Sequence, residues 1–391
     1  MASSNQPQEP QHPNLRQRLD ISNHTWRDWA NGLPQEMRAL IAERALDTDE
    51  KDLIRFRAVC SAWRDSIGGE NRINRSIHPR RWILLPEASD AATLCKFGNI
   101  ATGECIQLQN LHQLANHTVA EGPHGNPEGM LVLRDDTSFV IRLFNPLTRQ
   151  LIHLPSLKTL VVGVEGDDDQ MPDEEFGELH GVTAAGFVGG SKLVLYFDAI
   201  KMIAVAKPGD KDWEVVAYDR PLMSVATIGD HFYCLSTESL FEFDASTSPP
   251  QLVVVSQVDR PGNIILDTMR LVDNGGELLV LWNELHLHTQ GFWHLWYAVR
   301  RIDLNEGLMI PTYYLNDRAV VVGPSGAISV STTHFPELDA NTIYFRYGCN
   351  KDFIKQCALS NTYEYYRPPP GSFAKCLGSY VTNFAYTTCP H

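Results

Sequence analysis

Apolar and polar positions along the chain follow two different periods. Between residues 21 and 67 the period is helical, and Met37, Leu40 and Ile41 fall at positions i, i+3 and i+4 of one stripe. From Trp82 onward, short runs rich in β-branched and aromatic residues recur, and turn residues separate them. The pattern therefore predicts a small helical unit followed by a long β region, so the protein is expected to be mainly β.

The helical stretch is predicted to form three short helices. The first starts with Pro34 at its first helical position, where the missing N–H of proline costs nothing. The second has Thr48 as its N-cap and carries an apolar stripe from Leu53 to Trp63. The third ends at the glycine pair 68–69. Three short helices bury little apolar surface, so the unit is expected to need a partner, either the rest of the chain or another protein.

The β region contains a weakly repeated motif of strand, turn and exit strand. The turns FNPLT, FDAST and IDLNE start at Phe144, Phe243 and Ile302, which lie 99 and 59 residues apart. A propeller blade repeats about every 40–50 residues, so the first interval fits two blades and the second fits one blade with an insertion. A single β-propeller of about six or seven blades is therefore predicted. The runs predicted as strands are WILLP, MLVLR, FVIRLFNP, KLVLYF, MIAVA, WEVVAY, HFYCL, LFEFD, LVVVS, ELLVLW, VRRID, AVVVG, AISVS and TIYFRY.

Composition and charge narrow the classes of partner. The net charge of −14 and the pI near 5.4 argue against nucleic acid, because binding phosphates requires a basic surface. No run of about 18 apolar residues is present, so no membrane span is expected. Residues 1–20 are polar, contain no apolar signal region and are expected to form a disordered tail. The eight cysteines form no CxxC pair, which favours reduced thiols in the cytoplasm or the nucleus.

The helical stretch resembles an F-box. Its recognisable parts are the pair LP, then LIAERAL, and the block VCSAWR. F-boxes dock onto a Skp-type adaptor, which links them to a cullin and so to a ubiquitin ligase. The alternative is an ordinary helical subdomain packed on the β region. The resemblance implies that these residues contribute to the adaptor interface: Leu33, Pro34, Ile41, Val59, Cys60 and Trp63.

Trp63 suits two roles within such a unit. Its large apolar side chain makes it a natural hot spot at an interface between proteins. The same property suits the core of the helical unit, and the two roles stay open at the level of sequence.

The β region is similar to the KIB-type β-propeller domain that follows F-boxes in many plant proteins. The pieces that carry the resemblance are FNPLTRQLIHLP, IGDHFYCLS, RLVDNGGELLVLW, RRIDLNEGLMIP, LNDRAVVVGPSGAISVS and NTIYF, and they occur in the expected order. The resemblance implies an architecture and no particular ligand. The expected organisation is a tail (1–20), an F-box (21–68), a linker (69–82) and a KIB-type propeller (83–391).

Two stretches carry candidate chemistry. Glu284, His286 and His288 alternate, so on a strand they would share one face and could bind zinc or iron. The opposite hypothesis is a polar, solvent-facing side of a half-buried strand, with the leucines between them on the buried side. The acidic loop 163–180 could steer a basic substrate, although such a run more often forms a solvated insertion.

The sequence contains no nucleophile elbow, P-loop or GxGxxG motif, so no enzymatic activity and no cofactor are expected. We therefore predict a substrate-recognition subunit of a Skp–cullin–F-box ubiquitin ligase, in which the propeller binds an unidentified target protein. The alternatives are an F-box scaffold that acts outside a ligase and a metal-dependent propeller enzyme that uses His286 and His288.

Overall fold

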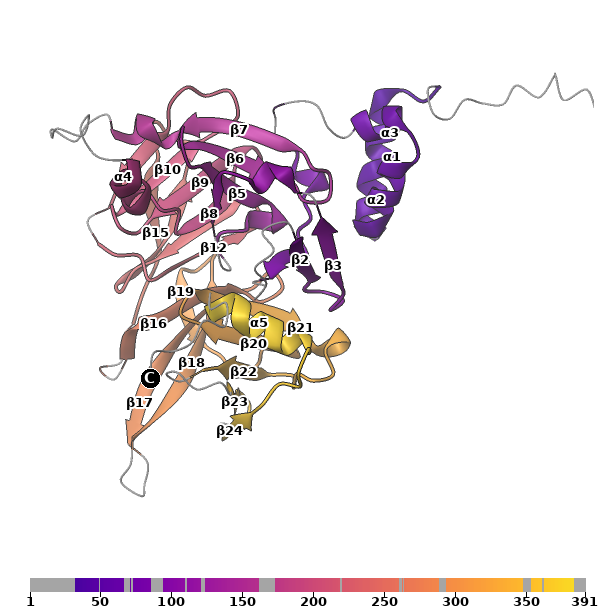
Figure 1. Ribbon diagram of the computed structural model, residues 1–391. Helices are drawn as coiled ribbons and strands as arrows, with labels where there is room; N and C mark the ends of the chain where they lie inside the picture. Colours follow the sequence, from indigo (N-terminus) through magenta and orange to yellow (C-terminus); the bar gives the residue numbers. More distant parts are fainter. Residues whose placement is uncertain are drawn as a thin grey trace, which may run out of the picture.

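The computed structural model describes residues 32–48, 50–66, 71, 73–85, 94–109, 111–120, 124–161, 173–218, 220–259, 262, 264–287, 293–346, 353–360 and 362–382. Three helices at the N-terminal end lie together beside a β-propeller, as Figure 1 shows. They are α1 (Gln35–Thr48), α2 (Glu50–Ala58) and α3 (Ser61–Asp65). The predicted tail lies outside the described residues.

The helix boundaries differ in part from the prediction. Pro34 lies just before α1, where its carbonyl accepts a hydrogen bond from Arg38 N at 3.2 Å. Thr48 is the last residue of α1, and α2 starts two residues later at Glu50, so Thr48 does not stand directly before α2. The predicted second helix stops at Ala58, because the backbone at Cys60 is extended with φ −165° and ψ 174°. The apolar stripe continues across this break, so spacing alone could not reveal it.

The helical unit has a very small core of its own. Ala42, Leu53 and Phe56 are buried there, together with Ile77 from the 3-10 turn η2 (Arg75–Ile77) of the connecting segment. Trp63 packs against this cluster, and its ring centroid lies 4.5 Å from that of Phe56. So small a core leaves much of the apolar surface of the helices uncovered.

The described residues form six sheets, which are the six blades of the propeller. The prediction of about six or seven blades is thereby refined to six. In the first five blades each strand pairs antiparallel with the next. Blades 1 to 3 comprise β1 (Trp82–Leu85), β2 (Leu94–Asn99) and β3 (Cys105–Gln109); β4 (His117–Val119), β5 (Leu131–Asp135), β6 (Val140–Phe144) and β7 (Leu151–Ser156); and β8 (Ala184–Val188), β9 (Lys192–Phe197), β10 (Met202–Ala206) and β11 (Glu214–Ala217). Blades 4 and 5 comprise β12 (Ser224–Ile228), β13 (His231–Leu235), β14 (Ser239–Asp244) and β15 (Gln251–Gln257); and β16 (Ile264–Asp273), β17 (Leu278–Leu287), β18 (Trp293–Asp303) and β19 (Leu308–Pro311).

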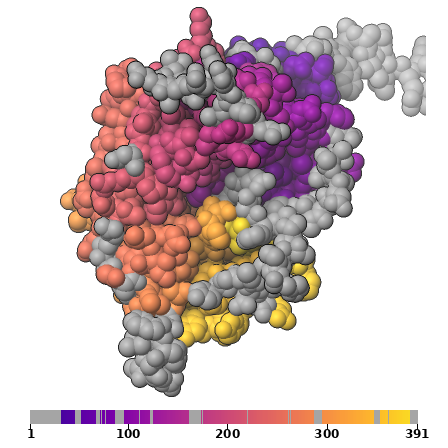
Figure 2. Space-filling model, turned by 60° about the vertical axis from the view of Figure 1, so that its left-hand side comes forward, coloured from indigo at the N-terminus to yellow at the C-terminus, as the bar shows by residue number. Residues whose placement is uncertain are grey.

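A separate apolar cluster fills the space between each pair of neighbouring blades. On β20 (Arg318–Gly323) the buried side chains alternate, since Val320 packs toward blade 5 and Val321 packs toward blade 1. A strand that is buried on both faces is selected for continuous apolar sequence, which is why runs such as KLVLYF are so easily recognised. Figure 2 shows the magenta blades of the middle of the chain packed against the orange blades that follow.

The repeated turns found in the sequence join the third and fourth strands of their blades. They connect β6 to β7, β14 to β15 and β18 to β19. In each turn a side-chain oxygen of Asn145, Asp244 or Asp303 accepts a hydrogen bond from a backbone N–H two residues further on. These local bonds explain why Asn or Asp recurs at this place.

Blade 6 differs from the others and closes the ring. Its five strands are β20, β21 (Gly326–Ser331), β22 (Thr342–Phe345), β23 (Phe353–Cys357) and β24 (Thr362–Tyr366), arranged in the order β21-β20-β22-β23-β24. Helix α5 (Phe373–Thr382), which the sequence analysis did not predict, packs between this blade and β1. The fit is tight, because a Cβ at Gly98 of β2 would lie 2.5 Å from the Phe373 ring.

The remaining helices are short. The predicted acidic loop is partly helical, since Asp173–Leu179 form α4, where Phe176 packs against Phe139; residues 162–172 lie outside the described part. The 3-10 turns besides η2 are η3 (His112–Leu114), η4 (Pro127–Gly129), η5 (Leu157–Val161) and η7 (Thr332–His334).

Candidate functional site

One face of α1 is apolar and open to solvent. Met37, Leu40 and Ile41 are 48%, 54% and 37% exposed, and their helical spacing puts them on one side of the helix. Two further apolar side chains of the unit, Ile54 and Val59, are also exposed. Large exposed apolar side chains gathered on one small unit are typical of a surface that binds another protein.

The six residues predicted to meet an adaptor are not equally accessible. Pro34, Ile41 and Val59 are exposed, whereas Leu33 and Cys60 are only partly so. Trp63 is partly buried against Phe56, so the structure gives it a packing role within the helical unit. The adaptor itself is not part of the structure, and the assignment of these six residues to an interface stays a prediction.

The segment that follows the helical unit is tied to blade 2 at several points. Asn71 forms two hydrogen bonds with the backbone of His153 on β7, at 2.7 and 3.3 Å. The carbonyl of Ile77 accepts a buried hydrogen bond of 3.0 Å from Nδ2 of Asn145. The helical unit is thus attached to the propeller through a segment with fixed partners.

Charged groups strengthen this attachment. Arg75 Nε lies 3.1 Å from both carboxylate oxygens of Glu128 in η4, and its guanidinium also forms an ion pair with Asp230 in the β12–β13 turn. His78 Nδ1 lies 2.7 Å from Oε2 of the same Glu128. Burial alone would raise the pKa of Glu128, but the hydrogen bonds from His78 and Arg75 outweigh it and lower the pKa to about 2. For His78 burial acts in the other direction and lowers the pKa of the imidazole, and this effect is larger than the opposite effect of the Glu128 carboxylate.

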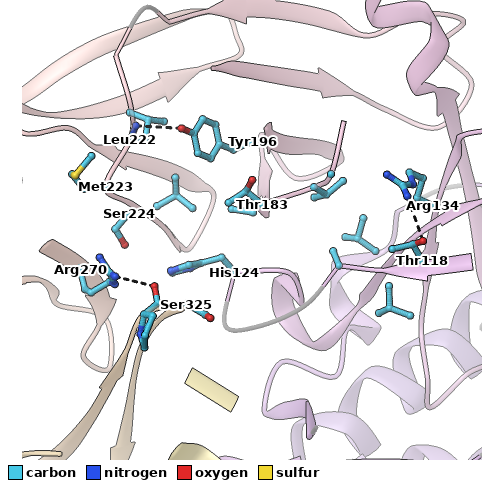
Figure 3. A pocket seen from close by; sticks show the side chains of 18 residues that line it. Thr118, His124, Arg134, Thr183, Tyr196, Leu222, Met223, Ser224, Arg270 and Ser325 are labelled. Atoms are coloured by element: carbon cyan, nitrogen blue, oxygen red, sulfur yellow. Dashed lines mark hydrogen bonds between the residues drawn. The ribbon is translucent and has the colours of Figure 1, made fainter. Parts of the chain in front are cut away.

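A second candidate site is a cavity of about 470 Å³ in the middle of the propeller. Its walls come from inner strands of several blades, including β4, β12 and β16, and from the β20–β21 turn of blade 6. Figure 3 shows the lining side chains, with Arg134 at one end and Arg270 at the other. A cavity of this size lies within the range of about 300–1,000 Å³ that accommodates small ligands.

The polar groups of the cavity are firmly held. Tyr196 OH donates to Asp198 Oδ1 at 2.7 Å and accepts a hydrogen bond from Leu222 N at 3.2 Å. Burial, together with the hydrogen bond to Asp198, raises the pKa of Tyr196, so the phenol stays neutral. The guanidinium of Arg270 donates to four backbone carbonyls, at 2.7 to 3.2 Å. Sequence reasoning missed this site, because its residues are scattered from Thr118 to Ser325 and form no local motif.

The structure gives little support to the alternative of a metal site at Glu284 and His286. Glu284 is only 9% exposed and its carboxylate oxygens are bonded to Trp282 Nε1 at 2.9 Å and His286 Nε2 at 3.0 Å. Leu285, expected on the buried side, is 37% exposed, so the predicted orientation of the strand faces is wrong. His288 lies outside the described residues, and among those described no group of three His, Cys, Asp or Glu side chains could hold a metal ion.

The architecture defines a class of protein, namely a six-bladed β-propeller that carries a small helical unit at its N-terminal side. Residues 81–367 match the model of the KIB1-4 beta-propeller family, and the chain therefore belongs to this family. No curated protein matches the sequence. In the part of the chain that is described, no helix is long and apolar enough to cross a membrane.

Solved structures show only a distant likeness. YCF48 from Cyanidioschyzon merolae is 9% identical, with 72% of this chain and 78% of that chain covered and a TM-score of 0.32. A chain in the crystal structure of BBS1N in complex with ARL6DN is 10% identical, with 72% of this chain and 75% of that chain covered and a TM-score of 0.31. A protein from Bacteroides fragilis described as a putative 6-phosphogluconolactonase is 11% identical, with coverages of 74% and 91% and a TM-score of 0.31. Likeness at this level says nothing about function.

Proposed function

We propose that this protein is the substrate-recognition subunit of a Skp–cullin–F-box ubiquitin ligase. The observation that carries the proposal is the exposed apolar face of α1, on a unit whose sequence resembles an F-box. Adaptor binding would bury Met37, Leu40 and Ile41, in the manner of a helix that lays its apolar face into a groove. The KIB1-4 propeller is consistent with a role in protein interaction and would bind the target.

The mechanism needs no bond chemistry within this chain. An adaptor on the helical unit and a target on the propeller would be held together, so that a lysine of the target has a high effective concentration near the ubiquitin-conjugating enzyme. The bonds that Asn71, Arg75 and Ile77 form with the propeller support this mechanism, because they restrict the position of the helical unit. Such a complex would operate in the cytoplasm or the nucleus.

A pull-down with a purified Skp-type adaptor tests the proposal. The variants are the pair Leu33→Ala with Pro34→Ala, and the single change Leu40→Asp. A matched control is Leu308→Asp on β19 of blade 5, because Leu308 is 56% exposed and Leu40 is 54% exposed. We expect both α1-side variants to lose binding by at least about tenfold, since placing a charge at an apolar contact costs more than about 1.4 kcal/mol.

The control and the wild type should bind alike, and circular dichroism should show the same helix and strand content in all four proteins. Equal binding by wild type and Leu40→Asp would contradict the proposal. Binding of the adaptor without any effect of this protein on the abundance of proteins captured by the propeller would instead favour the scaffold that acts outside a ligase. Metal analysis of the purified protein tests the third possibility, since the enzyme alternative requires bound metal.

A further inference from the structure

The central cavity combines apolar walls with a guanidinium at each end, that of Arg134 and that of Arg270. Val119, Val132, Val182, Leu222 and Val225 contribute aliphatic surface to it. Although the chain carries a net charge of −14, no Asp or Glu is among the residues that line this cavity. The cavity therefore offers a small molecule both apolar walls and positively charged ends.

In the part of the chain that the structure describes, the hydrogen bonds of Arg270 all go to neutral backbone carbonyls. Its Nη1 donates to the carbonyls of Asp267 and Met269, and its Nε and Nη2 donate to the carbonyls of Gly323 and Pro324. Within the described residues no carboxylate forms an ion pair with it, and one of the two Nη2 hydrogens has no acceptor. The Asp267 carboxylate acts on the guanidinium electrostatically without forming an ion pair with it. The guanidinium is thus held rigidly at the cavity with one donor free, which suits the binding of an anion.

Arg134, at the other end, is engaged differently. Its guanidinium lies 5.7 Å from the centroid of the Phe139 ring and donates to the carbonyl of Gly177. Asp136 interacts with it electrostatically and opposes the fall in its pKa that burial causes. Within the described residues, both guanidinium groups thus have a carboxylate that acts on them electrostatically and an N–H without an acceptor, and the Arg270 end differs in having His124 beside it.

His124 adds a second polar group at that end. Figure 3 shows its ring pointing toward Arg270 and Ser325. Its Nε2 is shielded from solvent and has no hydrogen-bond partner in the part of the chain that is described. Burial and the nearby Arg270 lower the pKa of His124 to about 4, so the ring is neutral at pH 7 and can donate one N–H to a ligand without adding charge.

We propose that this cavity binds a small organic carboxylate with an apolar body, the carboxylate at Arg270 and His124 and the body against the aliphatic walls. Arg270 supplies the opposite charge and a pre-positioned N–H, and His124 supplies the second hydrogen bond. The cavity of about 470 Å³ is large enough for a bicyclic aromatic acid. The proposal goes beyond the proposed function and does not depend on it, because no residue of α1 to α3 lines the cavity.

Calorimetric titration of the full chain with 2-naphthoate, phenylacetate and octanoate tests this site. The variants are Arg270→Gln, which removes the charge, and Ser325→Trp, which fills the cavity from the β20–β21 turn. Matched controls are Lys211→Gln, a charge removed from an exposed position away from the cavity, and Ser325→Ala. Because Arg270 also braces the β20–β21 turn, circular dichroism must confirm that each variant is folded, and Ser325→Trp remains informative if Arg270→Gln is not.

We expect at least one of the three acids to bind with a stoichiometry of one. Arg270→Gln and the neutral analogue (naphthamide for naphthoate) should each weaken binding by about tenfold to a hundredfold, the usual range for a charged hydrogen bond. Ser325→Trp should abolish binding, the two controls should bind like wild type, and the pKa of His124 followed by NMR should rise in the complex. Adaptor binding should be unchanged in all variants.

Three results would overturn the proposal. The first is the failure of all three acids to bind the wild type at millimolar concentration. The second is equal binding by wild type and folded Ser325→Trp, which would place the acids elsewhere. The third is competition by inorganic phosphate as effective as that by the acids, which would show that the apolar walls do not contribute.

Discussion

The guanidinium of Arg75 and the carboxylate of Glu128 form a bidentate ion pair, with Nε 3.1 Å from both carboxylate oxygens. The side chains are only 10% and 13% exposed, and the residues are 53 positions apart in the sequence. One belongs to the segment that leads from the helical unit and the other to η4, directly before β5. This pair therefore joins the two parts of the molecule and should be important for the stability of the junction.

Replacing Glu128 with Gln should destabilise the protein markedly. The change leaves the buried Arg75 without its main counter-charge, and breaking a buried ion pair on one side costs about 3–5 kcal/mol. A matched control is Glu238→Gln, since Glu238 pairs with Arg220 and the two side chains are 50% and 51% exposed. Its cost should stay below about 1 kcal/mol. Urea unfolding followed by tryptophan fluorescence measures both, and similar costs for the two changes would contradict the prediction.

The contribution of Glu128 to the free energy of unfolding should decrease as the pH falls. Its pKa falls from an ordinary value of 4.5 to about 2 in the folded protein. As the pH drops below 4.5, the unfolded chain takes up a proton at this carboxyl before the folded one does, so stability is lost. The difference in the free energy of unfolding between wild type and Glu128→Gln should be full at neutral pH and shrink as the pH approaches 2. A difference that stays constant between neutral pH and pH 2 would show that the pKa of Glu128 is not lowered by folding.

The buried His78 should also make the free energy of unfolding decrease as the pH falls, but in a higher pH range than Glu128. Burial lowers its pKa below the ordinary value of 6.5, so the folded state disfavours the charged imidazole. As the pH falls below 6.5, the unfolded chain is protonated first and the folded state loses stability. In His78→Gln, the free energy of unfolding should change less with pH just below 6.5 than in wild type. An unchanged slope in this variant would show that His78 does not contribute.

Helix α5 should be needed to close the propeller. Leu377 is fully buried in the cluster between blade 6 and blade 1, so Leu377→Ala should cost about 2–5 kcal/mol. Leu359→Ala is the matched control, because Leu359 is exposed, and a change of less than about 0.5 kcal/mol is expected there. The midpoint of thermal unfolding is measured for wild type, Leu377→Ala and Leu359→Ala. A midpoint for Leu377→Ala equal to that of the control would mean that the ring does not depend on α5.

Much of the propeller could be predicted from sequence because its strands are buried on both faces. The run KLVLYF is almost wholly apolar because Val194 packs toward blade 4 and Leu195 toward blade 2. Strands with exposed positions, such as β3 and β24, carry no such signal, so the sequence pattern does not predict them. Helix α5 shows the apolar spacing of a helix at Phe373, Leu377 and Val381, but so short a stripe after many strand signals does not by itself predict a helix.

The candidate sites differ in how far sequence could reveal them. The apolar face of α1 lies within one helix, so the spacing of Met37, Leu40 and Ile41 predicted it directly. The cavity could not be predicted, because Arg134, Arg270 and Ser325 come from different blades and meet only once the ring is closed. The connection through Glu128 was hidden for the same reason, since Arg75 lies far from it in the sequence.

The contact between the connecting segment and η4 leads to a last prediction, at Gly129. This glycine has φ +75°, and a Cβ built on it would lie 1.9 Å from the carbonyl oxygen of Pro79. Gly190 offers a matched control, because its φ is +76° and a Cβ there would meet nothing within 4 Å. Gly190→Ala should therefore cost only the backbone strain of about 1–2 kcal/mol.

Gly129→Ala should carry that strain and, in addition, force the backbone of the connecting segment away from η4. Overpacking of this kind adds roughly 1–3 kcal/mol, and more where the obstacle is backbone, which has no rotamer with which to move aside. The free energy of unfolding by urea measures both changes under the same conditions. Equal costs for the two variants would show that the connecting segment moves freely at Pro79. A larger cost at Gly129 would show that the backbone of this segment is fixed against η4, independently of the ion pair between Arg75 and Glu128.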